Sequence, residues 1–164
     1  MHKSSMPRFF WFGAAWLLLS GMVVGIDHCT KMRALLFPYN QPDNILGSWL
    51  RLRLAFNEGI AFSIGHGVQG WFPIILLLLS LALTAVLLIW LLTIQAPKWQ
   101  NAAAIALVLG GAIGNLWDRL SLGYVIDFID MGFRQWRFPT YNVADLCISL
   151  GVFWLCYQIY KKSP

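Results

Sequence analysis

Residues 71–94 read WFPIILLLLSLALTAVLLIWLLTI, and this stretch decides the fold because it contains no ionisable side chain. A helix of that length spans about 36 Å at roughly 1.5 Å per residue. The hydrocarbon core of a bilayer is roughly 30 Å thick, and about 20 apolar residues in a helix cross it. The stretch therefore predicts a membrane-spanning helix rather than the core helix of a soluble domain.

Three further segments have the same apolar character, namely residues 9–26, 99–117 and 141–160. Charged residues make up 12% of the chain, about half of the roughly 25% that soluble domains carry. We therefore expect an all-α membrane protein, a four-transmembrane-helix bundle that forms one domain over residues 1–164. Aromatic rings that favour the headgroup level stand near the segment ends: Trp11, Trp71, Trp90, Trp99, Trp117 and Tyr160.

The first segment also has features of a secretory signal peptide, because Lys3 and Arg8 precede an apolar run. However, Asp27 and His28 stand directly before Cys29, where cleavage at a lipid-modified cysteine would require small residues. We therefore expect this segment to be retained as a helix.

The polar composition limits the possible ligands and partners. Three Cys and three His show neither metal-site spacing nor a disulfide framework, so we expect no metal and no other cofactor. The net charge of +5 suits an anionic membrane surface, and no motif indicates a nucleic acid. We expect membrane lipid around the chain, and a monomer.

Nearly all of the remaining residues fall in two long connections, 27–70 and 118–140, on the same face of the predicted bundle. Residues 50–56 read LRLRLAF, in which large apolar side chains alternate with Arg51, Arg53 and Ala55, and a period of two is typical of a half-buried strand. A second extended piece covers residues 134–138. We expect a small β cradle and loops to cap the helices on the outer face.

Two pairs of glycines are spaced four residues apart, Gly21 with Gly25 and Gly110 with Gly114. Small residues at this spacing allow helices in lipid to pack closely. Both pairs therefore predict helix–helix contacts.

Asp145 lies just inside the fourth segment, and Asn142 precedes it by three residues. Residues at this spacing share a helix face, so the amide can orient the acid. The alternative is that Asp145 only stabilises the start of a helix through the helix dipole.

Asp127 follows the third segment in the run VIDFID. If the third and fourth helices are antiparallel neighbours, Asp127 and Asp145 lie at the same depth. Two carboxylates that close cannot both ionise in a low dielectric, so one keeps a proton and the pair can activate a water. Asp130 is the alternative partner, and spacing alone does not exclude it.

Asn115 and Arg119 are four residues apart and share a face of the third helix, whereas we expect Asp118 to point elsewhere. An amide and a guanidinium on one face can hold a peptide or orient a carboxylate. Alternatively, Arg119 reaches a lipid phosphate at the membrane surface.

Two other short patterns first suggest local structure. Asp27 and Lys31 are four residues apart and predict an ion pair at the end of the first segment. Asn57 and Gly59 predict a turn.

Five strings carry a family resemblance, and they occur in the order DHCTK (27–31), FNEGIAF (56–62), GGAIGNLWDR (110–119), VIDFID (125–130) and YNVAD (141–145). Together they resemble the bacterial lipoprotein signal peptidases, also called signal peptidase II. Each string alone is unspecific. Five of them in order, over almost the whole chain and with four spans of matching size, are specific.

The resemblance implies an intramembrane aspartic endopeptidase that removes signal peptides from diacylglyceryl-modified prolipoproteins and cuts before the lipidated cysteine. It also implies a place in the bacterial cytoplasmic (inner) membrane, with cytoplasmic termini and an active site near the outer leaflet. By motif match, Asp127 and Asp145 are the catalytic residues. The residues expected to bind substrate or support the site are Asn57, Asn115, Arg119, Asn142, Asp27 and Lys31.

Some features do not follow the family pattern. His28, Cys29 and Tyr141 stand where the family often has other residues, and none of the three is catalytic. Lys and Arg number five on the side of the termini and seven on the other side. Since cytoplasmic loops normally carry the excess, this count slightly opposes the implied orientation.

A membrane transporter or proton-conducting protein would also carry acids in its helices, and it is the alternative function. Such proteins normally bring their acids to the middle of the bilayer with broken helices or internal repeats. The sequence shows neither feature.

Overall fold

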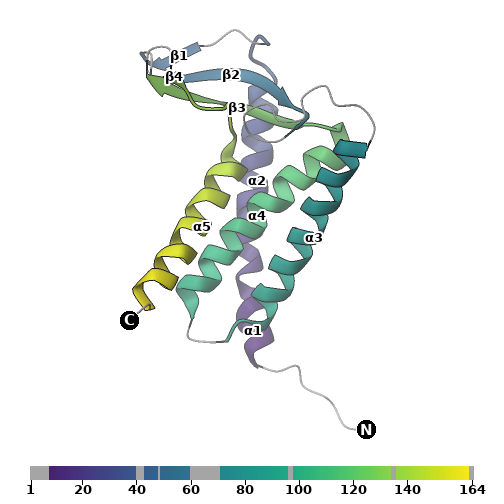
Figure 1. Ribbon diagram of the computed structural model, residues 1–164, viewed down its shortest axis with the longest axis vertical. Coiled ribbons are helices and arrows are strands. Elements are labelled where there is room, and N and C mark those ends of the chain that lie inside the picture. Colours follow the sequence, from purple (N-terminus) through teal and green to yellow (C-terminus); the bar gives the residue numbers. More distant parts are fainter. Residues whose placement is uncertain are drawn as a thin grey trace.

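The computed structural model describes residues 8–39, 43–47, 49–59, 71–95, 98–133 and 136–162. Within them, five helices form an elongated bundle, and four strands form a sheet across one end of it (Figure 1). The helices are α1 (Arg8–Ala15), α2 (Leu17–Ala34), α3 (Trp71–Thr93), α4 (Trp99–Leu122) and α5 (Val143–Lys162). The strands are β1 (Asp43–Leu46), β2 (Leu50–Asn57), β3 (Val125–Phe133) and β4 (Trp136–Arg137).

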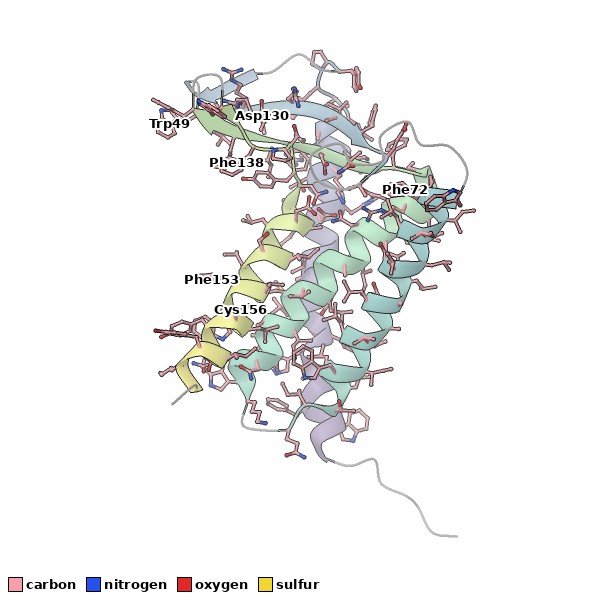
Figure 2. All side chains as sticks on the ribbon, in the orientation of Figure 1. Trp49, Phe72, Asp130, Phe138, Phe153 and Cys156 are labelled. Carbon is pink, nitrogen blue, oxygen red and sulfur yellow. The ribbon has the colours of Figure 1, made fainter. Side chains whose placement is uncertain are left out.

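Four helical segments of the described chain are long and apolar enough to cross a membrane: Trp11–Ala34, Trp71–Thr93, Trp99–Leu122 and Val143–Lys161. This confirms the predicted four-helix membrane bundle with a small sheet. The outer surface of the bundle is apolar, as lipid contact requires. Phe153, for example, is 70% exposed and points away from the other helices (Figure 2).

The first spanning segment is longer than predicted, because its helix continues past residue 26 to Ala34. Charged side chains suggested an end at Asp27, yet Asp27 and Lys31 are both buried in the helix. The prediction was wrong because the charges neutralise one another inside the protein, so they need not leave the bundle.

Helix α4 lies at the centre and contacts α2, α3 and α5. In the most apolar 18 residues of α4, 67% of the residues are buried, whereas the corresponding share is 11% in both α3 and α5. Glycines bring its neighbours close. A Cβ atom on Gly110 would lie 2.8 Å from the Ser20 carbonyl oxygen of α2. A Cβ atom on Gly111 would meet the Ala144 carbonyl oxygen of α5.

The two predicted glycine pairs therefore differ. Gly110 and Gly114 both face α2, as predicted. A Cβ atom on Gly21 or Gly25 would meet no other described atom within 4 Å. The prediction of a helix contact at Gly21 and Gly25 was wrong, because these two glycines lie on the outward side of α2.

The sheet is antiparallel, with strand order β1-β2-β3-β4. Strand β2 confirms the predicted strand at residues 50–56, but its simple alternation does not hold. A register shift between Leu52 and Ala55 sets Leu52 opposite Ile129 and Ala55 opposite Asp127. Such bulges bend a strand and redirect its side chains.

Only part of the second predicted extended piece can be compared, because Arg134 and Gln135 lie outside the described residues. The rest contributes the short strand β4. Strand β3 was not predicted. Most of its residues are buried, so it lacks the alternation of polar and apolar side chains that a half-exposed strand shows.

An apolar cluster attaches the sheet to the bundle. Ala34 at the end of α2 packs with Leu54 of β2 and with Ile126 and Phe128 of β3. Strand β3 therefore lies directly above the helices, while Trp49 and Phe138 lie toward the overhanging end of the sheet (Figure 2). This packing determines where the side chains of β3 meet the ends of the helices.

The close contact between α4 and α2 gives the first testable prediction. Replacing Gly110 by Val should destabilise the protein by about 1–3 kcal/mol, since the new side chain would overlap Val23 and the Ser20 carbonyl group. Thermal unfolding in detergent measures the effect. Gly21→Val is the matched control, and an equal loss of stability in both variants would contradict the packing described above.

Candidate active site

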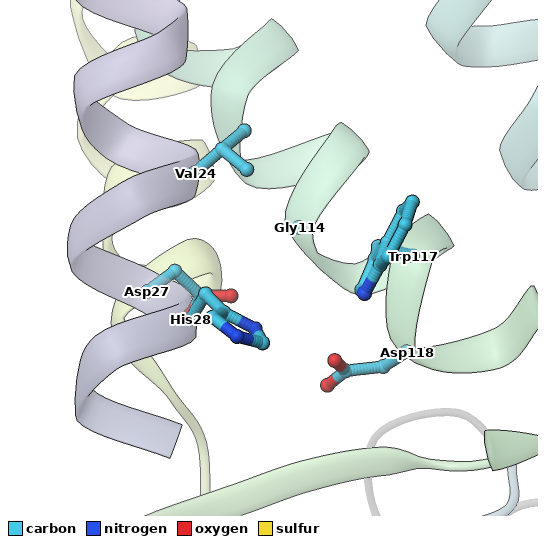
Figure 3. A pocket seen from close by; sticks show the side chains of 6 residues that line it. All are labelled: Val24, Asp27, His28, Gly114, Trp117 and Asp118. Atoms are coloured by element: carbon cyan, nitrogen blue, oxygen red, sulfur yellow. The ribbon is translucent and has the colours of Figure 1, made fainter. Parts of the chain in front are cut away.

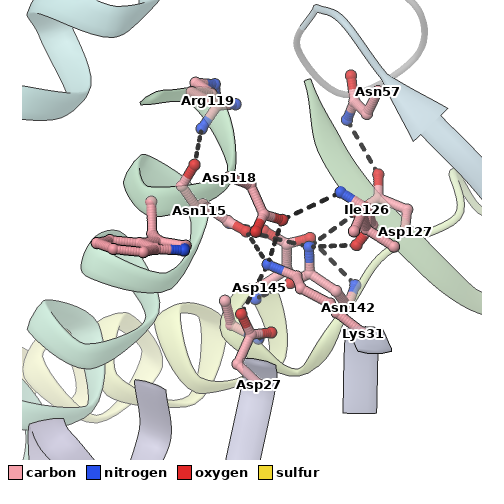
Figure 4. Close-up of polar contacts among 12 residues, drawn as sticks. Asp27, Lys31, Asn57, Asn115, Asp118, Arg119, Ile126, Asp127, Asn142 and Asp145 are labelled. Atoms are coloured by element: carbon pink, nitrogen blue, oxygen red, sulfur yellow. Dashed lines mark hydrogen bonds and ion pairs between the residues drawn. The ribbon is translucent and has the colours of Figure 1, made fainter. Parts of the chain in front are cut away.

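Two acids from different elements approach each other where the sheet meets the bundle (Figure 4). Asp127 lies on β3, and Asp145 lies in the first turn of α5. Asp127 is only 2% exposed. Asn142 bonds to both residues, because its side-chain amide donates to Asp127 Oδ1 at 2.8 Å and its Oδ1 accepts the Asp145 N–H at 2.9 Å.

The position of Asp145 follows from the local sequence. The backbone N–H of Asn142 donates to Asp145 Oδ2 at 3.2 Å, so the two residues cap the start of α5 reciprocally. Asn115 of α4 donates from Nδ2 to Asp145 Oδ1 at 2.7 Å. Asp145 thus stabilises the helix start, and amide side chains also hold it in a polar cluster.

Asn57 fixes the second oxygen of Asp127. The Gly59 N–H donates to Asn57 Oδ1 at 3.0 Å, which confirms the predicted turn. Because the oxygen is thereby occupied, the Asn57 amide nitrogen faces the sheet and donates to Asp127 Oδ2 at 3.1 Å. Both oxygens of Asp127 consequently receive an amide donor.

Burial and charge disfavour the ionised form of Asp127. Removal from water raises the pKa of its carboxyl group most, and the neighbouring Asp145 charge raises it further, to about 7. The hydrogen bonds from Asn57 and Asn142 and the charge of Lys31 act in the opposite direction. Near neutral pH Asp127 is therefore part protonated and part ionised, as general acid–base catalysis requires.

Lys31 connects three polar groups beneath the two acids (Figure 4). Its ammonium lies 2.6 Å from Asp27 Oδ2 and 2.9 Å from Asp118 Oδ2. It also donates to Asn115 Oδ1 at 3.1 Å. The predicted ion pair with Asp27 is therefore confirmed, as one part of a larger buried cluster.

Asp118 corrects the sequence analysis, which expected it to point away from Asn115. Besides contacting Lys31, its Oδ2 accepts the backbone N–H of Ile126 at 3.1 Å, which ties the end of α4 to β3. The spacing already held the signal, because residues 115 and 118 are three apart and share a helix face.

Arg119 lies at the edge of the same cluster. Its Nη1 donates to the Asn115 carbonyl oxygen at 3.4 Å, and its charge acts on Asp145, Asp127 and Asp118. It also lines a small cavity of about 140 Å³ together with Glu58 and residues of α3. A guanidinium in this place can meet a ligand beside the acids.

Asp130, the alternative partner, is engaged elsewhere. Nε of Arg137, on β4, donates to Asp130 Oδ1 at 2.9 Å. Nη2 of Arg137 lies 2.9 Å from the same oxygen. This ion pair fastens β4 to β3. The structure thus brings Asp127, not Asp130, into the hydrogen-bonded cluster that contains Asp145.

Two other cavities adjoin the cluster. One of about 440 Å³ opens beside Asp145 between α5 and the sheet, and its lining includes Met131, Phe138 and Leu146. Another of about 240 Å³ lies between α2 and α4, and its lining includes His28, Trp117 and Asp118 (Figure 3). Among the described residues, no group of three His, Cys, Asp or Glu side chains could hold a metal ion.

Comparison with known proteins identifies the chain. Residues 19–161 match the family described as signal peptidase (SPase) II. The chain belongs to the signal peptidase II family. A lipoprotein signal peptidase of Teredinibacter turnerae is 38% identical over 153 residues, which cover 92% of this chain and 88% of that protein. A lipoprotein signal peptidase of Pseudomonas putida is 41% identical over 156 residues, with 91% and 88% covered.

Solved structures agree with this assignment at the level of the fold. Two bacterial membrane enzymes superpose with TM-scores of 0.80 and 0.79, at 24% and 23% sequence identity. The first match covers 90% of this chain and 88% of the other, and the second covers 92% and 95%. Membership in the family supports a signal peptidase function, and with the four spanning helices it supports a bacterial multi-pass membrane protein.

The raised pKa of Asp127 predicts how pH changes stability. From its ordinary value of 3.8 up to about 7, the unfolded chain has lost the Asp127 proton while the folded chain keeps it. The folded state binds more protons, so stability falls as pH rises through this range. Asp127→Asn removes this effect. Its melting temperature relative to the wild type should therefore increase between about pH 5 and about pH 8.

Thermal unfolding in detergent at several pH values tests this expectation. Asp130→Asn serves as the control, because Asp130 is paired with Arg137. A constant difference between Asp127→Asn and the wild type at all pH values would show that Asp127 ionises normally.

Proposed function

We propose that this signal peptidase II family member is an aspartic endopeptidase in which Asp127 and Asp145 activate a water molecule. One observation carries the proposal. A buried acid, Asp127, and a partly buried acid, Asp145, come from separate elements and both bond to Asn142, and Asp127 keeps its proton up to neutral pH. Such a pair supplies a general acid and a general base at the same pH.

The chemistry needs no other group. The ionised carboxylate takes a proton from water as the oxygen attacks the scissile carbonyl carbon, and the protonated carboxyl group donates to the carbonyl oxygen. The resulting tetrahedral intermediate collapses when the C–N bond breaks and the leaving nitrogen receives a proton. Free acid and free amine are the products, and the pair returns to its singly protonated state. No metal and no covalent intermediate takes part.

The substrate we propose is a prolipoprotein carrying a diacylglyceryl-modified cysteine, cut directly before that cysteine. Relatives of the chain are named lipoprotein signal peptidases, which supports a prolipoprotein substrate. A lipid-anchored substrate can reach the acids sideways from the bilayer. The apolar cavity beside Asp145 lies between a spanning helix and the sheet, in keeping with such an approach.

The remaining polar residues have proposed supporting roles. Asn57 and Asn142 hold the oxygens of Asp127, and Asn115 holds Asp145. We propose that Arg119 contacts the substrate backbone beside the acids. Asp27 and Lys31 support the cluster from beneath.

We further propose that residues 1–164 work as one peptidase domain, as a monomer in the bacterial inner membrane. Both termini then lie in the cytoplasm, and the sheet end of the bundle lies at the outer leaflet. The resemblance of the five sequence motifs supports this orientation, and the near-even distribution of Lys and Arg does not decide it.

The catalytic pair is tested by conservative substitution. Asp127→Asn and Asp145→Asn should each lower cleavage of a diacylglyceryl-modified peptide by at least about 1000-fold, since neither the base nor the acid can be replaced by an amide. The assay uses purified protein in detergent or lipid. Asp130→Asn is the matched control and should keep most of the activity.

Retained turnover in either catalytic variant would refute the proposal. The same proteins in liposomes test the alternative function. Proton flux that depends on Asp127, without any peptide cleavage, would identify a proton-conducting protein instead.

Arg119→Ala should weaken cleavage less than loss of either acid, by about 10-fold to 100-fold, because it removes positioning and charge but leaves the acid pair intact. Steady-state kinetics with the lipidated peptide measure the change. Unchanged kinetics would mean that Arg119 contacts lipid phosphate rather than substrate.

A further inference from the structure

Lys31 is fully buried, at 0% exposure, so it cannot touch a substrate. An ammonium group has three hydrogen-bond donors. Three acceptors surround it, namely the carboxylates of Asp27 and Asp118 and the amide oxygen of Asn115. All three donors are therefore used inside the protein.

The third of these contacts leads directly to the catalytic pair. An amide side chain can point its oxygen or its nitrogen toward a neighbour. Because an ammonium group can only donate, Lys31 requires the oxygen of Asn115. The nitrogen must then point the other way, and it donates to Asp145 Oδ1 at 2.7 Å.

The same amide oxygen also receives a hydrogen bond from Asn142. Asn142 Nδ2 lies 3.1 Å from Asn115 Oδ1 and 2.8 Å from Asp127 Oδ1. If Asn115 were reversed, its NH2 group would face both the ammonium and the NH2 group of Asn142. Lys31 thus fixes one amide directly, and that amide helps to fix the second.

The ion pair with Asp27 adds a second route to Asp145. The backbone N–H of Ala144 donates to Asp27 Oδ1 at 2.8 Å, so Asp27 holds the first turn of α5. Gly114 leaves room for this contact, because a Cβ atom there would lie 2.7 Å from Asp27 Oδ2. Lys31 holds Asp27 in turn through the 2.6 Å ion pair.

From this geometry we infer that Lys31 is a positioning residue for the acid pair, which orients Asn115 toward Asp145 and supplies the buried positive charge beneath both acids. The inference rests on the proposed function of Asp127 and Asp145. It assigns to Lys31 a role in the reaction beyond local ion pairing and separate from substrate binding.

The charges around the acid pair come from every element packed there. They are Lys31 and Asp27 on α2, Asp118 and Arg119 on α4, Asp145 on α5 and Asp127 on β3. The thiol of Cys147 on α5 also interacts with Asp27. The charge of Lys31 lowers the pKa of Asp127. Loss of Lys31 should therefore raise the pKa of Asp127.

The test removes the cation while keeping the net charge of the cluster. Asp27→Asn with Lys31→Gln replaces one ion pair by two neutral amides. We expect kcat for the lipidated peptide to fall about 10-fold or more with little change in KM, because an oriented group near the reacting atoms is lost. The alkaline limb of the kcat/KM profile against pH, where Asp127 loses its proton, should move to higher pH.

Two matched proteins separate positioning from stability. Asp27→Asn alone keeps Lys31 and its bond to Asn115, so its alkaline limb should not move to higher pH. The double variant Asp130→Asn with Arg137→Gln removes another ion pair, at the sheet, and should keep the wild-type profile. Size-exclusion chromatography and thermal unfolding in detergent report whether each protein is folded.

A folded Lys31 double variant with wild-type kcat and an unshifted alkaline limb would overturn the inference, and so would an increase in KM alone. If that variant does not fold, Lys31→Arg decides, because it keeps the positive charge. Its alkaline limb should stay at the wild-type pH, and a shift would overturn the inference. Cleavage by Asp127→Asn would instead overturn the proposed function.

Discussion

The proposed site depends on how two carboxyl groups, one buried and one partly buried, are held together. Asp127 belongs to a strand and Asp145 to a helix, so neither backbone determines the distance between the two side chains. The side-chain amides of Asn142 and Asn115 make the connection. The Asn142 nitrogen donates to Asp127, and the Asn115 nitrogen donates to Asp145. The Asn142 nitrogen also donates to the side-chain oxygen of Asn115, which joins the two amides. A buried network of this kind is rigid only if every donor finds an acceptor. Lys31 supplies the donor that fixes the direction of the chain of amides.

This requirement explains the composition of α4. The helix must approach α2 and α5 closely enough for Asn115 to reach both Lys31 and Asp145. Gly110, Gly111 and Gly114 each occupy a position where a Cβ atom would overlap a neighbouring helix or its side chain. Gly114 in particular makes room for the Asp27 carboxylate. Close packing in lipid and the polar cluster are therefore consequences of the same small residues.

The sheet has an equally specific function in the architecture. It carries Asp127 to the end of the bundle, and the apolar cluster of Ala34, Leu54, Ile126 and Phe128 keeps β3 directly above α2. The register shift in β2 sets Ala55 opposite Asp127, with Asn57 two residues further along the strand. Asp145 and Asp127 meet because helix α5 begins where strand β3 crosses the end of the bundle. Membership in the signal peptidase II family supports a signal peptidase function, for which we propose the site at this junction.

The amino-acid sequence alone determined the membrane class, the four spanning helices and the family, because apolar length and motif order are local properties of the chain. It also indicated the polar residues that matter, since acids and amides beside a membrane require partners. Three features depended on tertiary structure: the strand β3, the burial of Lys31 and the convergence of Asp118 on it. A strand covered on both faces shows no alternation, and a charge at a helix end resembles a boundary until its partners from other helices are known. Local patterns reveal which groups are costly to bury, and only the fold shows how those groups satisfy one another.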